Sequence, residues 1–286
     1  MEELFENAKD WKENERKTRE QSDSELWLSL RKIMLTASNF GTVCRMRPTT
    51  SCATTVKSIL FPPSIDTAAM KYGRDMEKVV KQELSKILKK DIEPCGLFID
   101  SNNPWLGASP DGLLEEDGLV EIKCPLSAEN LTAEEAIHTL PRLKGIFDKK
   151  DPNAMNRNHR FFYQIQGQLN IAQRIFCIFA VWTPRNMKTV RVNRDNDFWQ
   201  NKMLPSLTRF YFDCMLPEIL DSRYIRHMPI REPKYIIEAK EKVLSKSINT
   251  CNTKRQHVIE SVDEEENKTI NHKRLKCNNS RQTRCV

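Results

Sequence analysis

The sequence lacks any apolar run long enough to cross a membrane, so we do not expect a membrane-embedded protein. It has no glycine-rich phosphate loop and no internal repeat. It also has no Ser/His/Asp set with the spacing of a nucleophilic triad. With only five histidines in 286 residues, a site built mainly from histidine is not expected either. These absences leave carboxylates and cationic side chains as the main sources of chemistry.

The cysteines predict neither a disulfide framework nor a zinc site, because there are nine of them, an odd number, and no CxxC pair. Cys124 and Cys177 lie in apolar contexts and are predicted to be buried thiols in a reducing compartment. The first residues are highly charged and contain no apolar h-region, which argues against a secretory signal. We therefore expect a soluble, intracellular protein, nuclear if the source is eukaryotic. The net charge of +7 has the sign expected of a polyanion binder.

Composition divides the chain into three parts. Residues 1–23 are dense in charge, and nothing in them requires packing. Residues 24–226 contain the periodic apolar segments and are long enough for one buried core. Residues 227–286 are polar and basic, with few aromatic residues, and are predicted to be a disordered tail.

Two short helices are predicted at the start of the core. Ser24 is a helix N-cap, and the helix that follows carries Arg31. Thr36 or Ser38 can cap the next helix. Arg31 therefore lies close in sequence to hydroxyl groups at a helix start, although a surface arginine paired with Glu25 would have the same pattern.

A long amphipathic helix is predicted over residues 67–89. Glu77 borders its apolar stripe, where it either faces a site or forms an i,i+4 pair with Lys81. Gly73 costs this helix about 1 kcal/mol relative to alanine, which predicts the close approach of another chain segment.

A β-hairpin is predicted between Leu106 and Pro125. Its strands are expected over residues 107–114 and 119–124. Asp117-Gly118 is a strong turn signal, because both residues tolerate a positive φ. Side chains alternate along the second strand, so Glu121 and Lys123 share the face opposite to the apolar side chains.

Further elements follow from apolar periodicity. They are a strand over 92–99, a helix over 132–139, a polar loop over 141–158, a helix from about Asn158, a buried strand over 175–182, its partner over 189–192, and a helix over 195–220 that Pro205 bends.

Asp111, Glu121 and Lys123 form the Asp…Glu-x-Lys pattern of metal-dependent nucleases. The turn-like kink at residues 109–112 aims the Asp111 carboxylate toward Glu121. Two carboxylates supply the hard oxygen ligands that Mg²⁺ requires, and the Ile122 carbonyl is a further candidate ligand. The Lys123 ammonium can orient or deprotonate an attacking water and offset negative charge. A solvated Glu/Lys pair beside an ordinary turn aspartate would leave the same pattern, which is weak by itself.

Several such patterns follow one another in an order that resembles the YqaJ-type viral recombinase family, also described as lambda-exonuclease-like alkaline nucleases of the PD-(D/E)xK superfamily. The resemblance covers about residues 24–215. It rests on the segments 27–31 (WLSLR), 35–38 (LTAS), 72–77 (YGRDME), 109–112 (SPDG), 121–125 (EIKCP) and 163–166 (YQIQ). It implies an α/β fold with a restriction-endonuclease-like PD-(D/E)xK core, in which helices flank a mixed β-sheet.

The resemblance also implies a metal site. Asp111, Glu121 and the Ile122 backbone carbonyl would hold Mg²⁺, or Mn²⁺ in its place. Glu77 would contribute at a second metal or through water.

The remaining implied roles concern water and DNA. Lys123 would assist the attacking water and Gln164 would help to position it. Arg31, with Thr36 and Ser38 at the next helix start, would bind a DNA phosphate, which in the family is the terminal 5′-phosphate.

The sequence thus predicts a metal-dependent DNA nuclease, and the resemblance favours a 5′→3′ exonuclease acting on duplex ends in recombination or repair. Two alternatives stay open: a catalytically inactive DNA-binding protein derived from a mobile element, and an endonuclease on the same fold. DNA is the expected partner. A homo-oligomer and a single-strand annealing protein are further possibilities that the residues themselves leave open.

Overall fold

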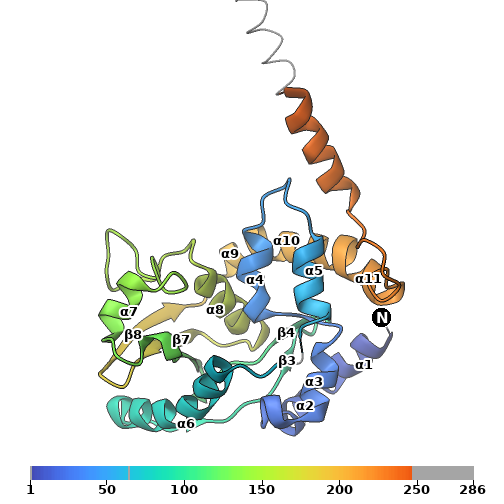
Figure 1. The fold of residues 1–286 in the computed structure, drawn as a ribbon. Helices are drawn as coiled ribbons and strands as arrows, with labels where there is room; N and C mark the ends of the chain where they lie inside the picture. Colours follow the sequence, from blue (N-terminus) through green and yellow to red (C-terminus); the bar gives the residue numbers. More distant parts are fainter. Residues whose placement is uncertain (1, 64, 247–286) are drawn as a thin grey trace, which may run out of the picture. The chain divides into compact units, whose positions relative to one another are not determined.

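The computed structural model describes residues 2–63 and 65–246, which belong to two compact units (Figure 1). The larger unit comprises residues 1–47 and 51–232, and the smaller comprises residues 48–50 and 233–286. In the smaller unit, residues 234–246 are helical. The basic cluster at residues 273–276 lies outside the described residues. Within the described residues, no helix has both the length and the apolar character needed to span a bilayer.

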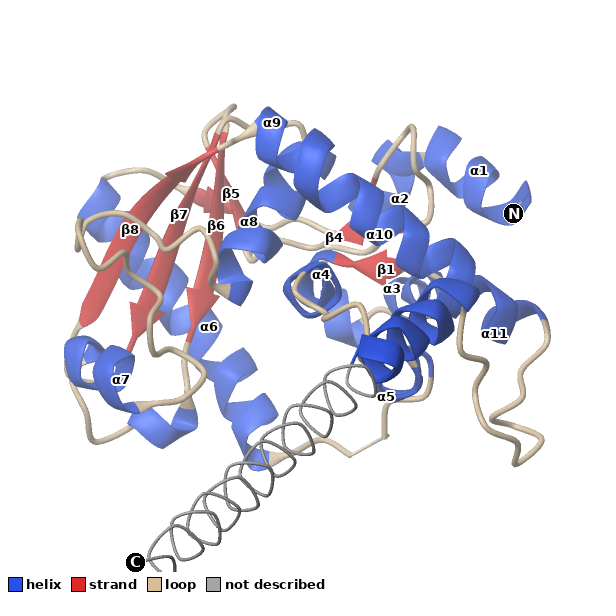
Figure 2. Cartoon of the chain, turned by 90° about the horizontal axis from the view of Figure 1, so that it is seen from above, coloured by secondary structure: helices blue, strands red, loops and turns tan. Residues whose placement is uncertain are grey.

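A five-stranded mixed sheet is the centre of the larger unit. Its strand order is β2-β5-β6-β7-β8, with β6 and β7 parallel and the other neighbours antiparallel (Figure 2). The predicted buried strand is confirmed as β7. The strands are β2 (Ile92–Glu93), β5 (Gly112–Leu114), β6 (Gly118–Lys123), β7 (Phe176–Trp182) and β8 (Met187–Asn193).

Helices cover both faces of this sheet. On one face, Val80 and Leu84 of α6 (Ala68–Leu88) pack against Val120 and Ile122 of β6 in a single apolar cluster. On the other face lies α8 (Arg160–Ile171), whose inward side carries amides that reach β6. This layering follows from the alternation along β6, and it confirms the predicted mixed sheet flanked by helices.

A smaller sheet has the strand order β1-β4-β3, and its strands are β1 (Leu35–Thr36), β3 (Phe98–Ile99) and β4 (Leu106–Ala108). Beside it, α4 (Ala37–Cys44) packs closely against α8. A Cβ added to Gly41 would lie 2.5 Å from the Arg160 carbonyl oxygen, and one added to Gly167 would lie 2.3 Å from the Phe40 ring. Both glycines are therefore required by the closeness of the two helices.

The remaining elements surround these two sheets. They are α1 (Glu2–Lys9), α2 (Trp11–Lys17), η1 (Gln21–Asp23), α3 (Glu25–Arg31), α5 (Ala53–Leu60), η2 (Leu126–Ala128), α7 (Ala133–Thr139), α9 (Asn196–Phe198), η3 (Trp199–Met203), α10 (Leu204–Phe210), η4 (Tyr211–Met215) and α11 (Leu216–Leu220).

Three predicted strand features were wrong. The strand expected over 92–99 is two strands, β2 and β3, which belong to different sheets. The first hairpin strand likewise divides into β4 and β5, because the kink at residues 109–112 interrupts it. The hairpin turn lies at residues 115–117, and its positive φ of 55° falls on Glu115, while Gly118 pairs with Leu114 as the first residue of β6.

The charged segment at residues 1–23 packs, although nothing in its sequence required this. Glu15 and Thr18 are buried and accept hydrogen bonds from the backbone N–H groups of Gly96 (2.9 Å) and Leu97 (2.8 Å). Gln21 donates to the carbonyl oxygens of both Cys95 (3.0 Å) and Pro110 (2.9 Å). Polar side chains that satisfy buried backbone groups hold this segment in place, and such contacts leave no apolar periodicity in the sequence.

The helix predicted over 195–220 forms as a series of segments from α9 to α11. Two of them, η3 and η4, are π-helical, and each directly precedes a short α-helix that has proline in its first turn, Pro205 and Pro217. Proline lacks the N–H group that a helix interior needs, so it is accommodated where a π-helical turn ends and a new helix begins.

The boundary of the predicted tail stays a prediction. Arg231 and Glu232 belong to the larger unit: the Arg231 guanidinium donates to the Asp221 carbonyl oxygen (2.8 Å), and the Ser51 hydroxyl donates to the Glu232 carboxylate. Residues 247–286 lie outside the described residues.

Candidate active site

A cavity of about 1040 Å³ opens where the end of β6 meets α6 and the start of α8. Ile122 and Lys123 line it from β6, and Asp111 lines it from the turn before β5. Gly73 and Glu77 face it from α6, one helical turn apart. The structure thus brings four of the predicted catalytic and metal-binding residues to one cavity.

Gly73 borders this cavity, and among the described residues no other chain segment approaches it. A Cβ added there would meet no atom within 4 Å. The predicted close approach of another segment was therefore wrong. The wider space at Gly73 belongs to the cavity that Glu77 also lines.

Glu121 is held rigidly beneath the cavity. The residue is only 1% exposed, and its carboxylate accepts hydrogen bonds from Gln164 Nε2 and Gln168 Nε2, each with a length of 2.6 Å. The Lys123 ammonium donates to the same carboxylate. A buried carboxylate is costly unless it is paired and hydrogen-bonded, and these three donors satisfy that requirement.

Asp111 faces the cavity from the kinked turn, as predicted. Its Oδ2 accepts a hydrogen bond from the backbone N–H of Ile122 (2.5 Å), and its own N–H donates to the Val120 carbonyl oxygen (3.0 Å). Burial, then the negative charges of Glu121 and Glu77, raise the pKa of Asp111 well above its usual value. In the described part of the chain no cationic side chain forms an ion pair with Asp111. The ionised form of Asp111 would therefore be stabilised by an external cation.

Lys123 carries the positive charge of this group. Burial alone would lower the pKa of Lys123, but the charges of Glu121 and Asp111 raise it on balance. Its Nζ lies 5.3 Å from the centre of the Phe161 ring. The ammonium therefore stays at the cavity between an aromatic face and two carboxylates.

Glu77 combines the two roles considered from the sequence. It forms the i,i+4 ion pair with Lys81, with an N–O distance of 2.6 Å. It also lines the cavity, and its charge raises the pKa of Asp111. Glu77 therefore acts on the site electrostatically while it is paired on its own helix.

Carboxylate oxygens, the donor type that a hard divalent cation takes, are the main candidate ligands at this site. Among residues 2–63 and 65–246, no three side chains of His, Cys, Asp or Glu form a metal-binding group. Side chains alone therefore do not complete a cage. Two carboxylates supplemented by a backbone carbonyl are typical of Mg²⁺, which keeps several waters, and this composition does not suit a softer metal.

Arg31 is connected through Trp27 to the turn that carries Asp111. Its guanidinium is 3.8 Å from the centre of the Trp27 ring, and Trp27 Nε1 donates a hydrogen bond to Ser109 Oγ over 2.9 Å. Burial lowers the pKa of Arg31 to about 10. Within the residues that the structure describes, Arg31 forms no ion pair, so the alternative pairing with Glu25 is absent.

The predicted helix-start donors lie at the beginning of α4. Thr36 is its N-cap, but its side chain makes no capping hydrogen bond; instead its hydroxyl lies 3.3 Å from the Ser38 hydroxyl. The hydroxyl and N–H groups at this helix start are suited to an anion. Arg31, Thr36 and Ser38 are not among the residues that line the cavity.

A family model for the YqaJ-like viral recombinase domain matches residues 26–174, which is just over half of the chain. The chain belongs to this family. The predicted family membership is therefore confirmed. No curated protein matches the chain.

Solved structures support the fold of the YqaJ-like domain. An alkaline exonuclease from Laribacter hongkongensis is similar with a TM-score of 0.53 and 22% identity, over 71% of this chain and 97% of that chain. Its complex with dAMP gives a TM-score of 0.54 and 21% identity, over the same shares of the two chains. A SOX–DNA complex gives a TM-score of 0.50 and 13% identity, over 78% of this chain and 74% of that chain. At these identities the likeness shows the fold alone.

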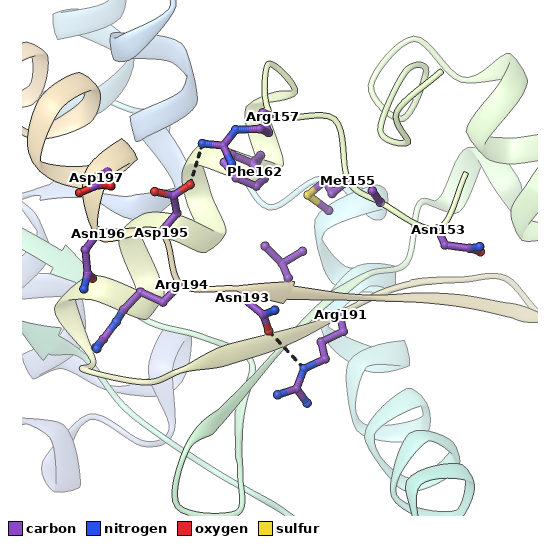
Figure 3. A pocket seen from close by; sticks show the side chains of 12 residues that line it. Asn153, Met155, Arg157, Phe162, Arg191, Asn193, Arg194, Asp195, Asn196 and Asp197 are labelled. Atoms are coloured by element: carbon purple, nitrogen blue, oxygen red, sulfur yellow. Dashed lines mark hydrogen bonds and ion pairs between the residues drawn. The ribbon is translucent and has the colours of Figure 1, made fainter. Parts of the chain in front are cut away.

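A second cavity of the YqaJ-like protein, of about 670 Å³, lies near the end of β8 (Figure 3). Its cationic groups are already engaged. Arg157 pairs with Asp195 (2.6 Å), and Arg191 donates to Asn193 Oδ1 (3.2 Å) and stacks on Phe176. Two aspartates, Asp195 and Asp197, also line it, but Asp195 is held by Arg157 and by the N–H of Phe198 (2.8 Å), so we do not assign a site to this cavity.

The sequence analysis missed Gln168. It lies one helical turn after Gln164, and both amides donate to Glu121. The i,i+4 spacing of two amides on a helix expected to face Glu121 was the signal that could have identified it. Its Oε1 is buried, with no partner in the described part of the chain.

Proposed function

We propose that this protein is a metal-dependent DNA nuclease that acts at duplex ends, and that it hydrolyses one strand in the 5′→3′ direction. The observation that carries the proposal is that Asp111, Lys123 and Glu77 line one cavity, with the buried Glu121 carboxylate bonded to Lys123 beneath it. Membership of the YqaJ-like family and the fold shared with an alkaline exonuclease and a SOX–DNA complex support it.

Asp111, Glu121 and the Ile122 carbonyl would hold Mg²⁺ or Mn²⁺, with Glu77 contributing at its edge. A divalent cation held there would supply Lewis acidity, by which an attacking water would be acidified and charge on the phosphate offset.

The chain's own residues fix the geometry of the reaction. Gln164 and Gln168 hold the Glu121 carboxylate in one orientation, so this carboxylate needs little reorientation during the reaction. The Lys123 ammonium is placed to stabilise negative charge that develops on the phosphate oxygens and to orient the attacking water.

Recognition of the DNA end is assigned to Arg31, with Thr36 and Ser38. A guanidinium binds phosphate oxygens bidentately, and Arg31 has no acidic partner in the described residues that would compete. A terminal 5′-phosphate carries more negative charge than an internal phosphodiester, so an end-directed enzyme gains most from such a contact.

Two other functions compete with this one. A non-catalytic DNA-binding protein would not need the buried Glu121 with its three donors, because burying a carboxylate is costly. An endonuclease on the same fold would keep the carboxylates but would have no need of an end sensor. Assembly into a homo-oligomer and cooperation with a single-strand annealing protein stay predictions.

Digestion of matched linear and covalently closed duplexes with Mg²⁺ separates these functions. The proposal expects loss of the linear form only, and no loss of either form in EDTA. Cutting of both forms would indicate an endonuclease. Retention of DNA without cleavage of either form would indicate the non-catalytic protein and would overturn the proposal.

A further inference from the structure

Two arginines that no predicted role includes line the same cavity as the carboxylates. Arg142 lies in the turn after α7, and Arg160 is the first residue of α8. Arg45 follows at the end of α4 as its C-cap residue. Arg45 and Arg142 are exposed, and Arg160 is half-buried.

The three guanidinium groups share one region. Burial lowers the pKa of Arg160, and the positive charges of Arg142 and Arg45 lower it further. Burial, Arg45 and Arg160 also lower the pKa of His159 to about 4, so His159 is neutral at physiological pH. The region therefore holds three mutually repelling cations beside an uncharged imidazole.

No acidic side chain compensates this group. Across the described ranges 2–63 and 65–246, Arg45, Arg142 and Arg160 form no ion pair. By contrast, Arg74, which lines the same cavity, pairs with Asp66 (2.5 Å), and Arg157 of the second cavity pairs with Asp195. Uncompensated positive charge at a concave, partly buried position favours a polyanionic ligand.

Helix packing fixes where these cations stand. The close approach of α4 and α8 at Gly41 holds the backbone of Arg160 directly against α4. Arg160 Cζ also lies 5.7 Å from the centre of the Phe161 ring. The cationic group is therefore part of a rigid scaffold, as binding sites that orient a ligand require.

We propose that Arg142 and Arg160, assisted by Arg45, bind backbone phosphates of the DNA strand next to the scissile bond. This inference rests on the proposed nuclease function, because it places the bound strand in the cavity that Asp111 also lines. It differs from end recognition in its target. Arg31 would bind the terminal phosphate, whereas Arg142, Arg160 and Arg45, called here the Arg142–Arg160 group, bind internal phosphodiesters. The ligand class is a nucleic acid strand with several phosphates.

Equilibrium binding without divalent metal tests the proposal independently of cleavage. The probe is a fluorescein-labelled linear duplex, and its binding is measured by fluorescence anisotropy at salt concentrations from about 50 to about 200 mM. Each phosphate contact contributes about 0.9 to the slope of log affinity against log salt. Arg142→Gln and Arg160→Gln are each expected to reduce that slope by about 1, and the double variant by about 2.

Arg157→Gln is the matched control, because Arg157 is already paired with Asp195 in the second cavity. It should keep the wild-type slope. Arg142→Lys should keep most of the slope, since it retains the charge. Melting curves verify that each variant is folded. Because Arg142 is exposed, its replacement leaves the buried core unchanged, so the Arg142 variants should fold.

The proposal is overturned if folded Arg142→Gln and Arg160→Gln proteins keep the wild-type slope, or if Arg157→Gln lowers it equally. The outcome is distinguishable from failure of the nuclease proposal. A protein that shows the expected slopes but never cleaves DNA would retain this binding site and lose the proposed activity.

Discussion

The indole of Trp27 connects two parts of the candidate site. Its Nε1 donates a hydrogen bond to Ser109 Oγ over 2.9 Å, and the Arg31 guanidinium lies 3.8 Å from its ring centre. Ser109 begins the turn that carries Asp111. One side chain therefore sets the position of the proposed end sensor relative to the proposed metal ligand, which is the spacing that an end-directed nuclease must control.

Replacing Trp27 by Phe should separate these two connections. Trp27→Phe removes the hydrogen bond to Ser109 but keeps an aromatic face beneath Arg31. A hydrogen bond of this kind contributes about 1 kcal/mol, so we expect a loss of about fivefold in digestion rate with the preference for 5′-phosphorylated ends retained. Trp27→Ala should reduce the rate and the preference. The measurement is the initial rate on duplexes with 5′-phosphate or 5′-hydroxyl ends; equal behaviour of both variants would contradict this.

Arg31→Ala should lower the preference for 5′-phosphorylated over 5′-hydroxyl ends. The reason is that the lost guanidinium contacts the phosphate but holds no metal. Initial rates on linear duplexes that differ only in that phosphate measure the ratio, and Arg157→Ala is a control with an arginine engaged elsewhere. A wild-type enzyme without any preference, or a variant that keeps the wild-type ratio, would rule out Arg31 as the end sensor.

Gly73→Ala should stabilise the protein. Glycine inside a helix costs about 1 kcal/mol relative to alanine, and a Cβ at Gly73 meets nothing within 4 Å. The melting temperature should rise by about 2–4 °C. Gly41→Ala is the opposite case, because its Cβ would lie 2.5 Å from the Arg160 carbonyl oxygen, and the melting temperature should fall. If both substitutions raised the melting temperature, or both lowered it, this account of Gly73 in α6 and Gly41 in α4 would be wrong.

His159 should make stability sensitive to acid. Burial and the charges of Arg45 and Arg160 lower its pKa to about 4 in the folded state, below the ordinary value of 6.5. The unfolded chain therefore binds this proton more readily, so stability is lost as pH falls from about 6.5 toward 4. Because His159 is partly exposed, we expect a discounted loss of about 1–2 kcal/mol.

His159→Asn tests this expectation. Asparagine can still cap α8, as the His159 ring now does for the N–H of Phe161 (3.3 Å), but it does not titrate. The difference in melting temperature between pH 7 and pH 5 should shrink in this variant, while His138→Asn, at an exposed position of α7, should leave it unchanged. An undiminished difference in His159→Asn would assign the acid sensitivity to other groups.

The sequence was most informative where a residue's role depends on local periodicity. The alternation along β6 placed Glu121 and Lys123 on one face and Val120 and Ile122 on the other, and the structure has both faces as predicted. The kink at Asp111 was also predictable, because Pro110 and Gly112 restrict and then release the backbone.

The sequence was least informative where long-range polar contacts decide the structure. Glu15 and Thr18 pack against the backbone at residues 96–97, which is roughly 80 residues away in the sequence. A contact over such a separation leaves no local pattern in the sequence. The division of residues 92–99 between two sheets likewise depends on which strands lie alongside. The Arg142–Arg160 group gathers residues from separate elements, so no spacing in the sequence reveals it.

Digestion of an end-labelled linear duplex by the wild-type protein and by Asp111→Asn tests the central claim most directly. With Mg²⁺, the wild-type protein should release labelled nucleotides, and EDTA should abolish release. Asp111→Asn keeps the shape of the side chain but removes a charged ligand, so its rate should fall by about 10³-fold or more, equivalent to several kcal/mol. Undiminished cleavage in EDTA, or full activity of a folded Asp111→Asn protein, would contradict the account.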